Sequence, residues 1–203
     1  MAKKENAKNV EITTAKPIVG SNIFYFIQSV EAEIGSAALL PAYRTDGTTT
    51  LGGEFVDEQT QQGRLVDKAT DEHSIEITQY FAPKDKSVKV IEEAQAKGRS
   101  IKIWEVIVDD SVKEQKEGKD VYPAKFGYGK ISEIERSAGT TDFVEVNYTV
   151  DIVGSLQDGM FYLTEEEIAA LKSVYAYQNP GETTGDYDAI VTEGGTAPAS
   201  PQG

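Results

Sequence analysis

The residues of this chain that could do chemistry are one histidine and a few groups of neighbouring carboxylates. His73 is the sole histidine and there is no cysteine, which excludes a histidine-rich metal site, a histidine-paired dyad and a thiolate nucleophile. His73 shares its strand parity with Ile75 and Ile77, so its imidazole is expected to be partly buried and hydrogen-bonded. The histidine therefore points to a structural role.

Adjacent carboxylates occur at Asp57-Glu58 and Asp109-Asp110. A glycosidase needs two carboxyl groups flanking one bond, but neighbours on a strand point to opposite faces and acids in loops are usually solvated. Asp186-Tyr187-Asp188 has part of the pattern of a calcium loop, but the glycine and the terminal glutamate of an EF-hand are missing. We predict a protein that is not an enzyme, with no metal and no cofactor.

Composition narrows the choice of function further. The chain has 203 residues, enough for one domain with long arms, and 34 Asp and Glu against 20 Lys and Arg give a net charge of −14. Such a chain repels phosphate and is a poor sequence-independent binder of nucleic acid. No apolar run is long enough for a membrane span or a signal peptide, so we expect synthesis in the cytoplasm and no membrane partner.

The clearest element is a strand over residues 142–154. Apolar residues such as Val146, Tyr148 and Val150 alternate with polar ones, which predicts one face on a core and one polar face. That polar face carries Glu145 and Asp151. A second alternating strand over residues 64–81 places Glu72 and Glu76 on a similar acidic face.

Further elements surround these two strands. Residues 22–31 and 35–44 are predicted as a strand hairpin, 100–109 as a strand with the sole tryptophan, and 122–136 as a strand that pairs with 142–154. A helix is predicted over about 85–97, with Asp85 or Ser87 as its N-cap and Gly98 as its C-cap. Thr164 heads a capping-box pattern for a second, short helix over residues 168–175.

Between two of the strands lies a long stretch, residues 45–63, that is rich in glycine, threonine and glutamine and is predicted as a loop. Leu51, Phe55 and Val56 are apolar residues within it. They either cover the core of their own subunit or contact a neighbouring subunit.

These elements predict a β-dominated α+β fold, a β-sandwich or half-barrel with a flanking α-helix. We divide the chain into an N-terminal arm (1–21), a β domain (22–177) and a flexible, acidic, Gly/Pro-rich C-terminal arm (178–203).

The order of elements resembles the major tail proteins, or tail tube proteins, of siphophages, in particular those of phages that infect Gram-positive bacteria such as staphylococci. The features that carry the resemblance are the aromatic strand 22–31, the long stretch 45–63 leading into a strand pair, the helix after Pro83, the strand bearing Trp104, and the hairpin ending at Gly154. The resemblance covers about residues 22–177.

The resemblance implies a structural virion protein that self-assembles in the host cytoplasm into stacked hexameric rings. The inner sheets of the subunits would join into one β-barrel, and the rings would form the hollow tail tube through which DNA is ejected. The implied partners are other copies of the chain, a tape-measure protein, a tail terminator, distal tail or baseplate proteins, and viral DNA passing without specific binding. Residues 45–63 and the two arms would bridge between rings.

Within that reading, we expect Glu72, Glu76, Glu145 and Asp151 to face the lumen, since acidic side chains repel DNA within a Debye length of about 8–10 Å. An ordinary solvated face is the alternative for these residues. For the whole protein, the alternative function is a carbohydrate- or receptor-binding β-sandwich module of a virion or cell surface.

Overall fold

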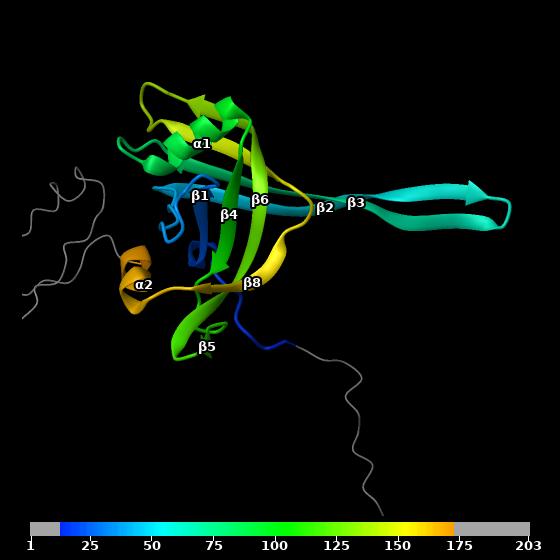
Figure 1. Cartoon of the computed structure of the whole chain (residues 1–203), viewed down its shortest axis with the longest axis horizontal. Coiled ribbons are helices and arrows are strands. Elements are labelled where there is room, and N and C mark those ends of the chain that lie inside the picture. Colours follow the sequence, from blue (N-terminus) through cyan, green and yellow to red (C-terminus); the bar gives the residue numbers. More distant parts are fainter. Residues whose placement is uncertain (1–12, 173–203) are drawn as a thin grey trace, which may run out of the picture.

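All strands in the described part of the chain, residues 13–172 of this computed structural model, belong to one antiparallel sheet (Figure 1). The strands are β1 (Ile23–Ser29), β2 (Arg44–Thr60), β3 (Gly63–Tyr80), β4 (Ser100–Ile107), β5 (Glu114–Lys116), β6 (Lys119–Ser137), β7 (Glu145–Ile152) and β8 (Gln157–Tyr162), and the helices are α1 (Lys86–Lys97) and α2 (Glu165–Lys172). The strand order is β1-β4-β6-β7-β3-β2, and β5 and β8 also pair with β6.

The sheet folds over so that its two terminal strands meet. The Tyr25 hydroxyl of β1 lies 3.4 Å from the Thr49 hydroxyl of β2, and Thr49 donates a hydrogen bond to Glu105 of β4. In Figure 1, β4 and β6 run vertically while β2 and β3 cross them horizontally. The predicted sandwich or half-barrel is therefore made by one bent sheet.

The main core lies inside this fold. It is formed by aliphatic and tyrosine side chains of β1, β3, β4, β6 and β7, by two residues of α1 and by one residue after β7. The core residues are Tyr25, Ile27, Ile75, Ile77, Ile91, Ala94, Ile101, Ile103, Ile131, Val146, Tyr148, Val150, Ile152 and Leu156. The apolar parity of β7 is buried as its alternation predicts.

Two glycines of β6 allow the sheet to bend this tightly. A Cβ at Gly129 would lie 2.4 Å from Val150 Cγ1 and 2.9 Å from the Asp151 carbonyl oxygen. A Cβ at Gly127 would lie 3.0 Å from both Ile152 and Leu156. Side chains at these positions would push β7 and the segment after it away from β6.

A buried polar network joins α1 to the sheet at one end of the main core. Asp85 caps α1 by accepting a hydrogen bond from the Ser87 amide (2.8 Å), and Gly98 ends the helix in the left-handed conformation (φ 60°). Asp85 also accepts a hydrogen bond from the side-chain amide nitrogen of Gln79, Nε2 (2.8 Å), and the Tyr148 hydroxyl donates to Gln79 Oε1 (3.1 Å). The predicted helix and its caps are confirmed.

A second core lies on the opposite face of β1, β4 and β6. Phe26, Val106 and Tyr122 are buried there, and the Phe26 ring stacks on Phe161 of β8 with 4.9 Å between centroids. Helix α2 packs over this core through Ile168 and Leu171. Its predicted capping box forms, since Thr164 Oγ1 accepts from the Glu167 amide and Glu167 Oε2 accepts from the Thr164 amide (3.2 and 2.8 Å). Helix positions expected at residues 173–175 lie outside the described residues.

Two predictions about the early strands were wrong. Residues 35–44 do not form a hairpin with β1, because β1 pairs with β4 and Leu39 makes only an isolated bridge to Ile27. Pro41 has no amide to donate, which interrupts strand pairing in that run. The stretch 45–63 is not a loop: β2 extends to Thr60, and its β-branched threonines favour the extended conformation.

We predict that Gly129→Ala will destabilise the fold by about 1–3 kcal/mol, because the added methyl group overlaps Val150 in a packed core. Denaturant unfolding measures the effect. Gly159→Ala in β8 is the matched control, since nothing lies within 4 Å of its added Cβ. Equal stability changes for the two variants would contradict the role of Gly129 in the bend.

The Tyr148 phenol gives a second prediction. Burial, and then the nearby Asp85 carboxylate, raise the pKa of Tyr148 well above its ordinary value of 10.0. The unfolded chain therefore ionises first as pH rises, and this part of the stability is lost above about pH 10. We expect Tyr148→Phe to cost about 1–3 kcal/mol at neutral pH, since Gln79 loses a buried partner.

The same variant should lose less stability than the wild type between about pH 8 and pH 11. Denaturant titrations across that range test this, with the exposed Tyr162→Phe as control. If the unfolding free energy of Tyr148→Phe falls with pH as steeply as that of the wild type, the phenol does not contribute to this pH dependence. Tyr25 and Tyr122, whose pKa values burial also raises, remain in both proteins.

Candidate functional site

Four neighbouring strands present one polar face away from the main core. Strand register aligns three rows across β2, β3, β7 and β6, so the side chains within each row share this face. The rows are Thr50, Ser74, Asp151 and Lys130; Thr48, Glu76, Thr149 and Glu133; and Asp46, Thr78, Asn147 and Glu135. Glu145 lies on the same face, opposite Tyr80. We call this surface the acidic face.

The structure brings the acids expected at the lumen onto this one face. Glu76 and Asp151 are exposed within it, Glu145 is half-buried, and Glu72 continues the same parity of β3 toward the distal part of the strand. The sequence analysis missed Asp46, Glu133 and Glu135. The alternation of Glu133, Ile134 and Glu135 was a signal that could have identified two of them.

The acidic face has little internal charge compensation. Asn147 Nδ2 donates to Glu76 Oε1 and to Thr78 Oγ1, both at 2.9 Å. Among residues 13–172, no ion pair involves an acid of this face, and Lys130 is the cation that the aligned rows contain. The face therefore repels polyanions that approach within a Debye length.

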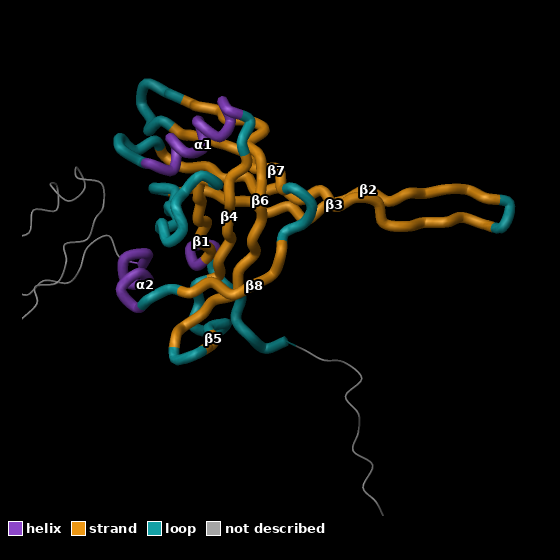
Figure 2. The backbone as a smooth tube through the Cα atoms, in the orientation of Figure 1, coloured by secondary structure: helices purple, strands orange, loops and turns teal. Residues whose placement is uncertain are grey.

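The second feature is a hairpin that projects far beyond the body (Figures 1 and 2). The proximal part of β3, Ser74–Tyr80, pairs with both β2 and β7, whereas the distal part pairs with β2 alone. The connection at the tip is Gln61-Gln62. An isolated two-stranded ribbon is only marginally stable in water, so this length of ribbon is suited to being covered by a partner.

Exposed apolar side chains lie on both faces of this distal hairpin. They are Leu51 (57% exposed), Phe55 (67%), Val56 (49%), Leu65 (63%) and Val66 (54%). The register puts Phe55 and Val66 on one face and Val56 and Leu65 on the other. None of them belongs to a core of its own subunit. Of the two roles expected for Leu51, Phe55 and Val56, covering their own core or contacting a neighbouring subunit, the second therefore remains.

The residues that could have done chemistry have structural partners. His73 Nδ1 accepts a hydrogen bond from the Leu156 amide (2.9 Å), which confirms the expected satisfied imidazole. Asp109 accepts from Asn22 Nδ2 (2.6 Å) and from the Ser111 amide and hydroxyl (2.9 and 2.6 Å), and these bonds lower its carboxyl pKa. Asp57 accepts from Arg64 Nε (2.8 Å) across the hairpin, which lowers the pKa of Asp57.

The described residues contain no group of three or more Asp, Glu or His side chains that could hold a metal ion. The fragment Asp186-Tyr187-Asp188 lies outside them. Across residues 13–172, no helix is both long and apolar enough to span a membrane.

The described residues thus form a bent antiparallel sheet with one acidic face and a long projecting hairpin, and comparison with known proteins gives the family. No family model matches the chain. It is similar to the tail tube protein gp17.1* of Bacillus phage SPP1, with 39% identity over 171 residues. The match covers 84% of this chain and 62% of that protein, so the chain spans less than two thirds of its relative's length.

Comparison with solved structures points to the same family. The SPP1 tail tube, determined by solid-state NMR and cryo-EM, matches with a TM-score of 0.63 and 34% identity, over 84% of this chain and 96% of that one. The chain belongs to the siphophage tail tube protein family, and its predicted tail-tube-like fold is confirmed. The tail of an empty GTA particle with C6 symmetry shares the fold alone, with a TM-score of 0.52 and 14% identity over 70% of this chain and 98% of that one.

We predict that the double variant Phe55→Ser/Leu65→Ser, with one substitution on each hairpin face, will reduce self-association without destabilising the monomer. Both side chains are exposed, so the expected change in unfolding free energy is within about 0.5 kcal/mol. Sedimentation velocity at matched concentrations measures association. Tyr162→Ser, an exposed residue in β8, is the control, and equal association of both variants would remove the hairpin from the interface.

Proposed function

We propose that this protein is the structural subunit of the tail tube of a long-tailed phage, in which its copies form stacked hexameric rings around a hollow channel. The observation that carries the proposal is the combination of a four-stranded acidic face with a hairpin whose apolar side chains are exposed on both faces. Similarity to the SPP1 tail tube supports the same function. The protein would act in the virion tail after assembly in the host cytoplasm.

The acidic face would line the channel. Joining the edges of the sheets from neighbouring subunits into a closed barrel would pair strands that a single subunit leaves at an edge, such as β1 and β2. Glu72, Glu76, Glu145 and Asp151 would then repel DNA from the wall, so that viral DNA passes without specific binding. A tape-measure protein would occupy the channel before the DNA does.

The hairpin would bridge successive rings, with Leu51, Phe55 and Val56 in the contact. Chain segments 1–21 and 178–203 would serve as arms beside a β domain of residues 22–177. A tail terminator and distal tail or baseplate proteins would close the two ends of the tube. The proposal contains no catalytic step and no cofactor.

Electron microscopy of the purified full chain at high concentration tests the proposal directly. Rings or tubes of uniform diameter are the expected result. A monodisperse monomer that binds glycans would instead favour the alternative, a carbohydrate- or receptor-binding β-sandwich module.

Charge reversal tests the assignment of the acidic face. We expect Glu145→Lys/Asp151→Lys to assemble into tubes, because neither side chain is fully buried, but to slow DNA ejection from phages that carry it, because cations on the wall attract phosphate. Ejection kinetics in vitro measure the effect. Glu165→Lys/Glu166→Lys on α2 introduces the same charge change away from the acidic face and is the control. Unchanged ejection from tubes of the first variant would refute the lumen assignment.

A further inference from the structure

The hairpin tip and a group of exposed aromatic residues lie at opposite ends of the same two strands. β2 has 17 residues, so the ribbon it forms with β3 is about 55 Å long. One end is the apolar tip of the hairpin. At the other end β2 begins at Arg44 and β3 finishes at Tyr80, and Tyr43, Phe81 and Phe143 surround these positions.

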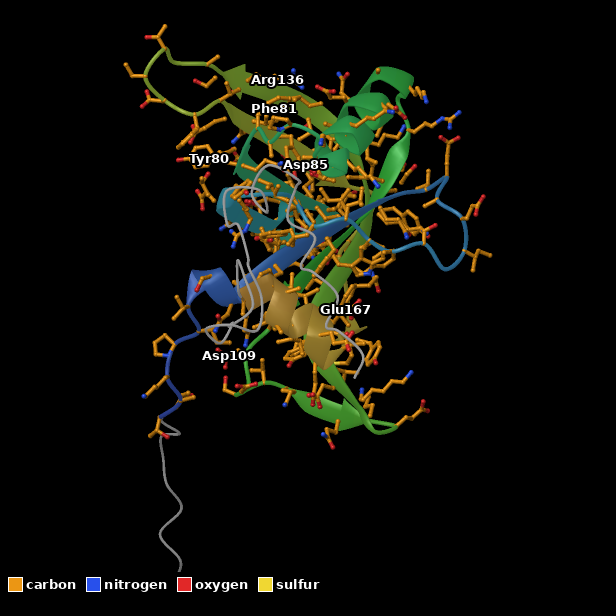
Figure 3. The ribbon with its side chains drawn as sticks, turned by 90° about the vertical axis from the view of Figure 1, so that its left-hand side faces the viewer. Tyr80, Phe81, Asp85, Asp109, Arg136 and Glu167 are labelled. Atoms are coloured by element: carbon orange, nitrogen blue, oxygen red, sulfur yellow. The ribbon has the colours of Figure 1, made fainter. Side chains whose placement is uncertain are left out.

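These aromatic residues gather at one end of the sheet, and we call Tyr43, Tyr80, Phe81 and Phe143 together the aromatic end patch. The Tyr80 amide donates to the Tyr43 carbonyl (3.1 Å), and the Tyr80 and Phe143 ring centroids are 5.4 Å apart. The Phe81 amide donates to the Val144 carbonyl (2.7 Å), which holds Phe81 beside the residue that follows Phe143. Figure 3 views this end of the body and shows Phe81 next to Arg136.

The patch is exposed in the described structure. Tyr43 is 58% exposed, Phe81 43% and Phe143 77%. The Arg136 guanidinium lies 5.1 Å from the centre of the Phe81 ring and covers part of it. Exposed aromatic side chains gathered at one end of a sheet favour a contact site for another molecule.

The backbone beside the patch supports this reading. Tyr43 (φ 51°) and Lys84 (φ 71°) adopt the left-handed conformation, which side-chain-bearing residues seldom occupy. Such strain is retained mainly where it places residues for a function. Here it directs the chain around the two edges of the patch.

Charges of opposite sign without an ion-pair partner among the described residues occur at the two ends. In the distal hairpin the cations Arg64 and Lys68 are already paired with Asp57 and Asp71. Carboxylates without an ion-pair partner remain there, namely Glu54, Glu58, Asp67 and Glu72.

At the other end, Lys84 and Lys86 follow Phe81 closely in the chain and make no ion pair with another described residue. Asp142 and Glu145 border the patch on the side of Phe143, whereas Lys84 and Lys86 lie on the side where α1 begins. The distribution favours one orientation of an acidic, apolar ribbon across the patch.

We propose that the aromatic end patch is the receptor for the hairpin tip of a second copy of this chain. The inference rests on the proposed stacking of rings and identifies the surface that receives the hairpin. Translating one copy along the β2–β3 ribbon brings its tip against the patch of the next. Because the two surfaces differ, the contact is heterologous and repeats without closing, as growth of a tube requires.

Each face of the hairpin has a distinct role in this contact. Phe55 and Val66 share one face, and Val56 and Leu65 share the other. The Val56 and Leu65 face, which also carries Glu58, packs on the aromatic end patch, with the carboxylate of Glu54 or Glu58 close to Lys84 and Lys86. The other face is left for the adjacent subunit of the receiving ring.

Disulfide trapping tests the proposal, since the chain has no native cysteine. Single variants Val56→Cys, Phe143→Cys and Gln115→Cys are purified, mixed in pairs, assembled and oxidised with a mild catalyst, with each variant alone as a further control. We expect at least a tenfold larger yield of mixed dimer for Val56→Cys with Phe143→Cys than for Val56→Cys with Gln115→Cys, which lies in β5.

Electron microscopy of the same samples separates two kinds of failure. If tubes form but the Val56→Cys and Phe143→Cys pair is not enriched, the receptor assignment is wrong and the tail tube function stands. If wild-type chains form no rings or tubes, the proposed function itself fails.

Charge reversal gives an independent readout. The variant Lys84→Glu/Lys86→Glu should slow tube elongation, measured by light scattering, at least tenfold. Adding Glu54→Lys/Glu58→Lys to that same variant chain should restore most of the elongation rate. Circular dichroism checks that both variants fold. An elongation rate that the lysine changes leave unaltered, or that the compensating changes do not restore, would overturn the orientation proposed for the hairpin.

Discussion

The close approach of β6 and β7 at Gly129 is the constraint on which the rest of this structure depends. With no side chain at Gly127 or Gly129, one sheet can bend over itself and enclose a core between strands that are distant in its order. The terminal strands β1 and β2 then meet through Tyr25 and Thr49. A flat sheet of the same strands would leave both faces in water, and the apolar parity of β7 would have nothing to pack against.

The bend also decides which surfaces are free. The inner faces of both halves of the sheet are used by the main core, and the outer face of β1 and β4 is covered by β8 and α2. The outer face of β2, β3, β7 and β6 is the one that remains; it is polar in every aligned row and carries more acids than cations as a whole. Core formation and the presentation of the acidic face are therefore consequences of the same fold.

Helix α1 fixes the end of the body where the aromatic end patch lies. The network of Asp85, Gln79 and Tyr148 is largely buried and its hydrogen bonds have ordinary lengths of 2.8 to 3.1 Å, so it holds the start of the helix against the ends of β3 and β7. The Arg136–Glu92 ion pair adds a link from the helix to β6. The distal hairpin has no such support within its own subunit, which fits a segment completed by contact with another copy.

The sequence by itself determined the local features of this protein. Alternation fixed which side of β7 is buried, and capping chemistry indicated where both helices begin, near Asp85 and Thr164. Each of these depends on residues close together in the chain, where period and cap preferences act directly.

Only the tertiary structure decided how distant segments pair. Glycine and threonine content made residues 45–63 look like a loop, whereas pairing with β3 makes them a strand, because a cross-strand partner supplies the hydrogen bonds that local preference does not show. The same holds for β1, whose strand partner β4 lies far along the chain, whereas the neighbouring run 35–44, which contains Pro41, makes only an isolated bridge to β1. Glu133 and Glu135 joined the acidic face, and Phe143 joined Tyr80, through register, which no single strand specifies.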